Sequence, residues 1–408
     1  MTRFAARGSG ENAPSVPIGL VFSCTGSYRT VGEEILNGAL LAVEEVNSGA
    51  GYGFRFEPKI EDPGGDLNEY RVCCEELLRN KAVRHVVGCY TSSSRKEVIP
   101  VFEKFDGLLW YPSHYEGFES CNNVIYTGAA PNQHIVPLIE YALREFGDRV
   151  YCVGSNYIWA WENNRIMREI VVACGGTIVA EKYLPVGSTD IRHFVDEIIA
   201  TKPSFIFNTL IGESSYAFLR AVREAARGDP ALDLGKMPIT SCNLSEPELL
   251  SVGEQAAAGH IASSVYFQSK ERAANRTFVS RFKARFGASK VTSADAEASY
   301  IAVKLLARAI QEAQSTEIEQ VKEAVYTCEF EAPQGPVRID PDNNHSYLTP
   351  SLGRSRANGQ FEIIWSADEP LKPDPYLVRF DVRRFSEGLH QLPDGEEKAR
   401  PRHLRVVK

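Results

Sequence analysis

Phenol and hydroxyl side chains follow two neighbouring apolar runs of the sequence, where their spacing could serve hydrogen-bonding chemistry. They belong to Tyr90 and Ser92 after the first run and to Tyr111 and Ser113 at the end of the second. In parallel α/β sheets, ligands bind just beyond the carboxyl ends of strands, where backbone N–H groups of the next helix point outward. Directed hydrogen bonds and aromatic walls suit a small neutral polar ligand. The alternative is that Ser92–Ser94 cap a helix and the tyrosines pack in the core.

Aromatic side chains also gather after a later apolar run, 149–155. They are Tyr157, Trp159 and Trp161, just before an expected helix. An exposed ring forfeits the stabilisation that burial gives, so three aromatics in a solvated loop are unusual. They could form a pocket wall or a contact between lobes, and packing under a neighbouring loop is the alternative. Two further strand ends, at 208–214 and at 241–245 with Asn243, offer polar groups whose alternative role is helix capping.

Catalytic and metal-binding signatures are missing from the sequence. It contains no G-x-S-x-G elbow, H-E-x-x-H pair or phosphate-binding G-x-x-x-x-G-K loop, and no G-x-G-x-x-G follows the first strand. The eight histidines are scattered, and no C-x-x-C pair occurs among the nine cysteines. We therefore expect a protein without enzyme activity, metal or cofactor.

Length and charge narrow the class of protein. A chain of 408 residues is too long for one ordinary core, so two domains are expected. The formal net charge of -8, without a long basic cluster, argues against direct binding of nucleic acid. No stretch approaches the roughly 18–20 apolar residues that span a bilayer. Residues 1–17 lack the apolar core of an export signal, so we expect a cytoplasmic chain; an upstream start codon that adds a signal peptide would place it in the periplasm.

The elements that must position these side chains alternate over residues 18–267, where short apolar runs are followed by amphipathic stretches. Such alternation predicts an α/β fold with two doubly wound parallel sheets. A helical stretch, 272–327, is expected to cover the first sheet, and short β segments follow between 337 and 365. The polar residues 1–16 are expected to form a mobile arm, and residues 377–408 a peripheral or mobile tail.

Six motifs, taken together, are similar to those of one known family. They are EDPGGDLNEYR (61–71), VVGCYTSSSRK (86–96), WYPSHYEGFE (110–119), AAPNQH (129–134), APQGPVRIDPDNNHS (332–346) and KPDPY (372–376). In this order they resemble AmiC-type proteins, the cytoplasmic amide sensors and negative regulators of bacterial aliphatic amidase operons, over about residues 16–376. Broader relatives are the urea- and short-amide-binding receptors of ABC transporters and, more distantly, the branched-chain amino-acid-binding proteins.

The resemblance implies the type I periplasmic-binding-protein fold, in which two α/β lobes joined by three crossovers close on a ligand. Lobe I, the main ligand-binding lobe, would comprise residues 17–130 and 268–335. Lobe II would comprise residues 131–267 and 336–376.

The resemblance also implies a set of ligand-binding residues. By position these are Tyr90, Ser92, Tyr111, Ser113, Tyr157, Trp159 and Asn243. Three of them depart from the AmiC-type pattern: Ser113 stands for a threonine, Trp159 for a second tyrosine, and Asn243 with its neighbour Leu244 for a pair of threonines. Amide binding is compatible with these changes, while the preferred acyl chain, and the choice between amide and urea, stay open.

The function implied by the resemblance is a cytoplasmic sensor of short aliphatic amides. Ligand binding would shift an equilibrium between open and closed states, and the two states would differ in their binding of an AmiR-type antiterminator protein. The alternative is a substrate-binding protein that delivers urea or a short amide to an ABC transporter. A small neutral ligand is common to both, and homo-oligomerisation stays open.

Overall fold

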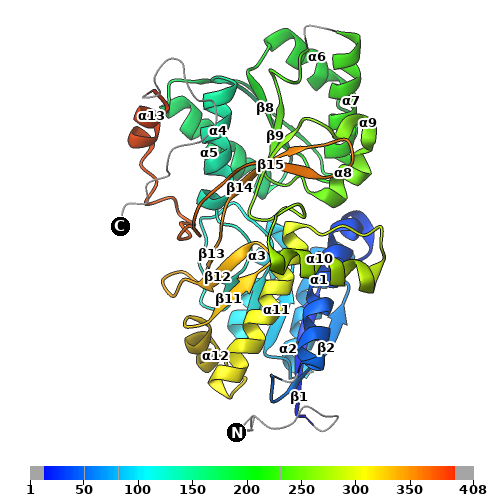
Figure 1. Ribbon diagram of the computed structural model, residues 1–408, viewed down its shortest axis with the longest axis vertical. Helices are drawn as coiled ribbons and strands as arrows, with labels where there is room; N and C mark the ends of the chain where they lie inside the picture. Colours follow the sequence, from blue (N-terminus) through cyan, green and yellow to red (C-terminus); the bar gives the residue numbers. More distant parts are fainter. Residues whose placement is uncertain (1–12, 50, 81, 230–231, 391–408) are drawn as a thin grey trace. The chain divides into compact units, whose positions relative to one another are not determined.

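The computed structural model describes residues 13–49, 51–80, 82–229 and 232–390 (Figure 1). The chain divides into two compact α/β units. Unit 1 comprises residues 1–129 and 270–348, and unit 2 comprises residues 130–269 and 349–408. The chain therefore passes from one unit to the other three times.

Unit 1 is built on a five-stranded sheet in the order β2-β1-β3-β4-β5. Its strands, all parallel to their neighbours, are β1 (Ser15–Val21), β2 (Arg55–Glu61), β3 (His85–Gly88), β4 (Leu108–Tyr111) and β5 (Val124–Tyr126). The helices between them are α1 (Arg29–Ser48), α2 (Leu67–Asn80) and α3 (Ser92–Phe105). Every residue of β3, β4 and β5 is buried, so these strands are apolar on both faces.

Helices from later in the chain complete unit 1. They are α10 (Ala273–Phe286), α11 (Ala294–Ala313) and α12 (Ile318–Val325). The Ser299 hydroxyl of α11 donates to the Ile35 carbonyl of α1 at 2.6 Å, and a side chain at Gly38 would come within 2.0 Å of a carbonyl oxygen of α11. Because α11 also contacts β3 and β4, this part of the predicted helical stretch 272–327 covers the first sheet, while α10 and α12 pack on α1 and α11, respectively.

Unit 2 is built on a seven-stranded sheet in the order β15-β14-β10-β9-β8-β6-β7. Its strands are β6 (Arg149–Ser155), β7 (Thr177–Leu184), β8 (Phe205–Thr209), β9 (Ile239–Ser241), β10 (Ile261–Ser264), β14 (Ser351–Ser355) and β15 (Phe361–Ser366). The first five are parallel, and β14 and β15 add an antiparallel edge. Its helices are α4 (Ile135–Glu145), α5 (Ile158–Ala173), α6 (Arg192–Thr201), α7 (Glu213–Gly228), α8 (Glu246–Val252), α9 (Glu254–Ala257) and α13 (Val382–His390).

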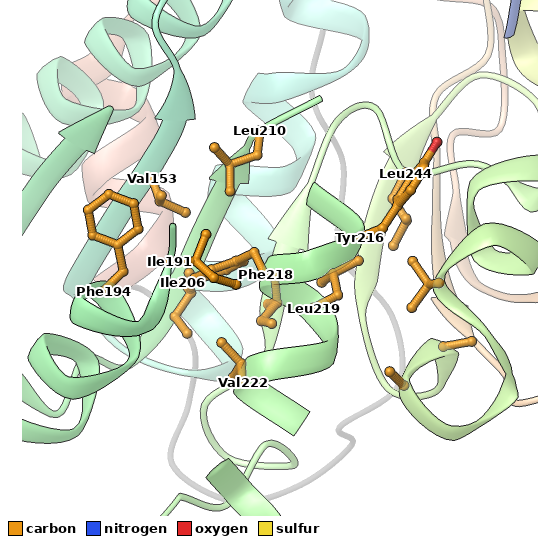
Figure 2. Packing of buried hydrophobic residues seen from close by; sticks show 14 of the residues in the cluster. Val153, Ile191, Phe194, Ile206, Leu210, Tyr216, Phe218, Leu219, Val222 and Leu244 are labelled. Atoms are coloured by element: carbon orange, nitrogen blue, oxygen red, sulfur yellow. The ribbon is translucent and has the colours of Figure 1, made fainter. Parts of the chain in front are cut away.

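The core of unit 2 lies between its sheet and the helices α6 and α7. Figure 2 shows Phe194 of α6 and Phe218 of α7 beside Val153 and Ile206 of the sheet. All four side chains are buried, and burial of an aliphatic or aromatic side chain of this size contributes roughly 1.5–3 kcal/mol. This packing gives the carboxyl ends of β6 and β8 a rigid base.

The observed division differs from the predicted lobes at the third crossover, which lies after Leu348 rather than after residue 335. A small antiparallel sheet explains the difference: β11 (Glu329–Ala332), β12 (Gly335–Ile339) and β13 (Ser346–Tyr347) pair in sequence. The segment that follows β12 is bonded to unit 1, because the Tyr126 N–H donates to the Asn344 carbonyl at 2.8 Å. The first two crossovers lie within a few residues of the predicted ones.

The chain ends and two helix starts also differ from expectation. Of the predicted arm 1–16, residues 1–12 lie outside the described residues, and Ser15 and Val16 already belong to β1, where they pair with β2. Of the tail 377–408, residues 391–408 lie outside the described residues, and α13 contacts α4 and α5. The amphipathic patterns predict helices from Arg95 and from Glu162, but α3 begins at Ser92 and α5 at Ile158, and α8, α9 and β11 were not expected at all. Among the described helices, none has the length and apolar character that crossing a membrane requires.

Candidate ligand-binding site

Each unit has one point where the strand order reverses direction. In unit 1 the first strand, β1, lies between β2 and β3, and in unit 2 the first strand, β6, lies between β7 and β8. Ligands of open α/β sheets bind outside the carboxyl ends of strands at such a point, since the connections leave it on opposite faces. We therefore describe the side chains at these two strand edges, one unit at a time.

The end of β3 in unit 1 has an unusual backbone. Cys89 is fully buried and adopts φ 66°, a left-handed conformation that residues other than glycine rarely take. Its N–H donates to the Val21 carbonyl of β1 at 3.0 Å, and the Tyr111 hydroxyl donates to the next carbonyl, that of Tyr90, at 2.7 Å. These bonds fix the direction in which the chain leaves β3.

Ser92 begins α3, but it does not cap the helix. The N-cap is Thr91, whose hydroxyl oxygen accepts a hydrogen bond from the Ser94 N–H at 3.1 Å. The Ser92 hydroxyl instead donates to the carboxylate of Glu116. The capping alternative therefore applies to Thr91, and the hydroxyl of Ser92 has a separate role.

A buried group of charged side chains lies behind Ser92. The Arg95 guanidinium is fully buried, with Nε 2.7 Å from Glu119 Oε1 and Nη2 3.3 Å from Glu116 Oε1. The same guanidinium lies over two aromatic rings, 4.7 Å from the centroid of Tyr111 and 4.5 Å from that of Tyr115. These contacts join α3 to the loop that connects β4 and β5.

The charges within this group balance. Burial by itself would raise the pKa of Glu119, but Arg95 and Lys96, whose Nζ lies 2.8 Å from Oε2, lower that pKa to about 2. Burial lowers the pKa of His345 to about 3, so its ring is neutral at neutral pH. Two cations, Arg95 and Lys96, thus face two carboxylates, Glu116 and Glu119.

Tyr90 and Tyr28 place two phenol rings beside each other at the reversal point of unit 1. The ring of Tyr90 is half-buried and meets the ring of Tyr28 edge to face, with 5.9 Å between centroids and 62° between planes. Tyr28 belongs to a short 3-10 turn (Gly26–Tyr28) after β1. Sequence reasoning missed Tyr28; the polar turn that follows the first predicted strand was the signal that could have found it.

Ser113 follows β4 and has an unusual environment. It is 1% exposed, and its hydroxyl oxygen has no hydrogen-bond partner among the described protein atoms. Its backbone is tightly packed, because a side chain at Gly128 would come within 2.1 Å of the Ser113 carbonyl. A buried hydroxyl without a partner is costly, so the Ser113 hydroxyl keeps an unused hydrogen-bonding capacity.

In unit 2 the aromatic cluster lies at the end of β6. Tyr157 occupies the N-cap position of α5 and Trp159 lies in its first turn, with 6.3 Å and 24° between the two rings. Trp159 is buried, whereas Trp161 is 44% exposed and donates to Asn156 Oδ1 at 3.1 Å. The cluster is thus part of a helix start rather than a loop.

Asn243 links the ends of β9 and β8. Its Nδ2 donates to the Leu210 carbonyl at 3.0 Å, and its Oδ1 accepts from the Ser241 hydroxyl at 2.6 Å. A similar link joins β6 to β8, since the Ser155 hydroxyl oxygen accepts from the Ile211 N–H at 3.1 Å. These bonds support the strand edge, and they also occupy part of the bonding capacity of Asn243.

The structure brings the predicted residues together in groups. In unit 1, Tyr90, Ser92 and Tyr111 meet around the ends of β3 and β4, with Ser113 just after them. In unit 2, Tyr157 and Trp159 are neighbours at the end of β6, and Asn243 lies after β9. Contact of these seven residues with a ligand stays a prediction. Sequence reasoning missed Arg95, Glu116 and Glu119, because their burial and pairing depend on tertiary contacts.

Comparison with known proteins agrees with this architecture. A sequence model described as a periplasmic binding protein domain matches residues 16–381. Over 348 residues the chain is 21% identical to Leu/Ile/Val-binding protein homolog 6 of Brucella abortus, covering 84% of this chain and 88% of that one. A solute binding protein of an ABC transporter from R. palustris, solved in complex with 4-hydroxybenzoate, superposes with a TM-score of 0.77 at 18% identity, covering 89% of this chain and 99% of that one.

A shorter match concerns a protein named limonene hydroxylase, from Geobacillus stearothermophilus. It is 32% identical over 136 residues, 33% of this chain, and this chain spans only 25% of that protein. So short a match carries nothing about the activity of the whole hydroxylase to this chain. The match over residues 16–381 and the two α/β units agree instead that the chain belongs to the periplasmic binding protein domain family, with the fold of the type I binding proteins.

Proposed function

We propose that this protein is the solute-binding protein of an ABC transporter and that its ligand is a short amide or urea. The relatives with long matches carry the names of solute- and amino-acid-binding proteins. They favour the transporter role over the amide sensor, which the motifs alone had placed first. The family is typically periplasmic, so the expected cytoplasmic location has no support from these relatives.

The observation that supports a neutral ligand is the balance of charges among the buried groups behind Ser92 in unit 1. Arg95 and Lys96 are each within 4 Å of a glutamate carboxylate, so neither offers an unpaired cation to an acidic ligand. The groups nearest the end of β3 are phenols and hydroxyls. A primary amide, with two N–H donors and one carbonyl acceptor, can satisfy such groups without burial of charge.

The amide sensor is the second candidate, favoured by the motifs at 86–96 and 110–119. They contain Ser92, Arg95, Glu116 and Glu119, the groups that the structure joins into one bonded cluster. A sensor would work in the cytoplasm and bind an AmiR-type partner differently in its open and closed states. Cell fractionation separates the candidates, because a transporter's binding protein must be found outside the cytoplasmic membrane.

Calorimetric titration of the purified full chain tests the proposed ligand. The ligands are acetamide, urea, leucine and 4-hydroxybenzoate in one buffer. We expect acetamide or urea to bind, and Tyr90→Ala to weaken that binding at least about tenfold, since a half-buried ring that lines a site contributes roughly 1–2 kcal/mol.

Tyr52→Ala is the matched control. Tyr52 is also half-buried in unit 1, but it precedes β2 and therefore lies at the amino ends of the strands. Its replacement should leave the affinity unchanged. If only leucine or 4-hydroxybenzoate binds, the family assignment stands, but the proposal of a neutral ligand is wrong.

A further inference from the structure

We propose that Glu116 determines which ligands the site accepts, by fixing the Ser92 hydroxyl as a hydrogen-bond acceptor. This inference rests on the proposed function, because it concerns the same site. Glu116 itself is a positioning residue and would not touch the ligand. The consequence is a requirement that the ligand present an N–H donor at Ser92.

The argument begins with the single proton of the Ser92 hydroxyl. A carboxylate can only accept hydrogen bonds, so the bond between Ser92 and Glu116 takes the proton of Ser92. Both side chains are 2% exposed, so solvent does not compete for this bond. What remains on Ser92 Oγ is its lone pairs.

Glu116 is held in this orientation by the protein. Arg95 Nη2 lies 3.3 Å and Lys96 Nζ 3.9 Å from its Oε1, while its Oε2 receives the Ser92 proton. Arg95 is fixed in turn by Glu119. The polarity of the Ser92 bond is therefore set before any ligand arrives, and charge-assisted bonds of this kind are stronger than neutral ones.

Tyr111 at the neighbouring strand end has the same polarity. Its proton is given to the Tyr90 carbonyl at 2.7 Å. A ligand that placed a carbonyl or carboxylate oxygen beside Ser92 and Tyr111 would bring its lone pairs against theirs. No hydrogen bond would form, and the ligand's acceptor would stay unsatisfied. An amide or urea N–H meets the requirement. The Ser113 hydroxyl, which has no partner among the described atoms, still has a proton to offer to the ligand's carbonyl.

The test compares acetamide with acetone, in which a methyl group replaces the NH₂ group at nearly the same shape. For the wild-type chain we expect a preference for acetamide of roughly 100-fold, because a site built to bond an N–H rejects the analogue that lacks it. Ser92→Ala should reduce the preference to about tenfold or less. Glu116→Gln should do the same, since the amide of glutamine can donate to Ser92 and release the serine proton.

A double-mutant cycle separates positioning from general structural damage. If Glu116 acts through Ser92, Glu116→Gln should have little further effect on the preference in a Ser92→Ala background. A purely structural role would instead lower the affinities for acetamide and acetone by the same factor and leave the preference unchanged. Glu103→Gln, an exposed replacement on α3, is the control and should change neither affinity.

Glu116→Asp covers the case in which the glutamine variant does not fold. It keeps the negative charge beside Arg95 and withdraws the carboxylate from Ser92 by one methylene, so it should also lower the preference. An unchanged preference in Glu116→Asp, with acetamide still bound, overturns the inference and leaves the proposed function standing. If the wild-type chain binds neither acetamide nor urea, the proposed function itself is wrong.

Discussion

The strand edges of the two units use different chemistry. In unit 1 the hydroxyls are backed by ionised groups, with the Arg95 guanidinium bonded to Glu116 and Glu119. In unit 2 the corresponding hydrogen bonds join neutral groups. Ser155 and Asn243 each bond to a backbone group, and Asn243 also bonds to the Ser241 hydroxyl. Both strand edges hold their hydroxyl and amide groups by hydrogen bonds within the protein, but only in unit 1 is one of these hydroxyls bonded to an ionised group.

The difference suggests a division of roles. A buried ionic group is expensive to desolvate and is retained where it specifies one arrangement. Neutral side-chain hydrogen bonds, such as those at the ends of β8 and β9, cost less free energy to bury. In unit 1 the charged groups hold the Ser92 hydroxyl in one arrangement, whereas in unit 2 the rings of Tyr157 and Trp159 lie beside each other at the start of α5.

The largest expected effect comes from Arg95→Met. The replacement removes a fully buried cation and leaves the carboxylates of Glu116 and Glu119 with only Lys96 nearby. Uncompensated buried charge costs roughly 3–5 kcal/mol, so the free energy of unfolding should fall by about that amount. Thermal unfolding followed by calorimetry measures it, because urea is itself a proposed ligand.

Arg168→Ala in unit 2 provides the contrast. Arg168 pairs with Glu181, but its side chain is 42% exposed, and such pairs contribute about 0–1 kcal/mol. A loss for Arg95→Met as small as the loss for Arg168→Ala would show that the charged group of unit 1 is not stabilised by pairing, and the comparison between the units would fail.

The loss of folding stability at acid pH should arise mainly from the charged groups around Arg95 in unit 1. Pairing with Arg95 and Lys96, which outweighs burial, lowers the pKa of Glu119 from 4.5 to about 2. Because the unfolded chain binds the proton first, this contribution is complete above pH 4.5 and is lost as the pH falls towards 2. The stability difference between the wild-type chain and Glu119→Gln should shrink by about 2 kcal/mol between about pH 6 and about pH 3.

The control for this titration is Glu103→Gln, on the exposed side of α3. Its stability difference from the wild-type chain should stay constant over the same range. His345, whose pKa burial lowers to about 3, also destabilises the fold as the pH falls below 6.5. Its contribution cancels in the comparison with Glu103→Gln, whereas in Glu119→Gln the pKa of His345 falls further, because Glu119 raises that pKa.

Much of the fold could be predicted, because apolar periodicity is a local property. The helical stretch expected at 272–327 is observed as three helices between Ala273 and Val325, and the apolar run 149–155 forms the strand Arg149–Ser155. The edge formed by Tyr90 and Tyr111 was also predictable, since the carboxyl ends of neighbouring parallel strands meet. The third crossover was not, because the pairing of β12 with β11 and β13 leaves no periodic signal.

The charged side chains that hold Ser92 could not be predicted from the sequence for a similar reason. Ser92 and Glu116 are 24 residues apart, and only the packing of the β4–β5 loop against α3 brings them together. The serines looked like helix caps, yet Thr91 takes that role. Hydroxyl-rich turns thus identify a helix start, while the partner of each hydroxyl depends on tertiary contacts.

The smallest expected effect is also the one that most directly contrasts the units, because unit 2 keeps a buried acid neutral. Glu246 begins α8 and accepts the Gln268 N–H at 2.7 Å, and burial raises its pKa to about 8. The folded state therefore loses stability as the pH rises from 4.5 towards 8. Glu246→Gln should gain about 1 kcal/mol on the wild-type chain between about pH 5 and about pH 6. The exposed replacement Glu254→Gln should gain nothing, and a loss for Glu246→Gln would mean that unit 2 also stabilises an ionised carboxylate.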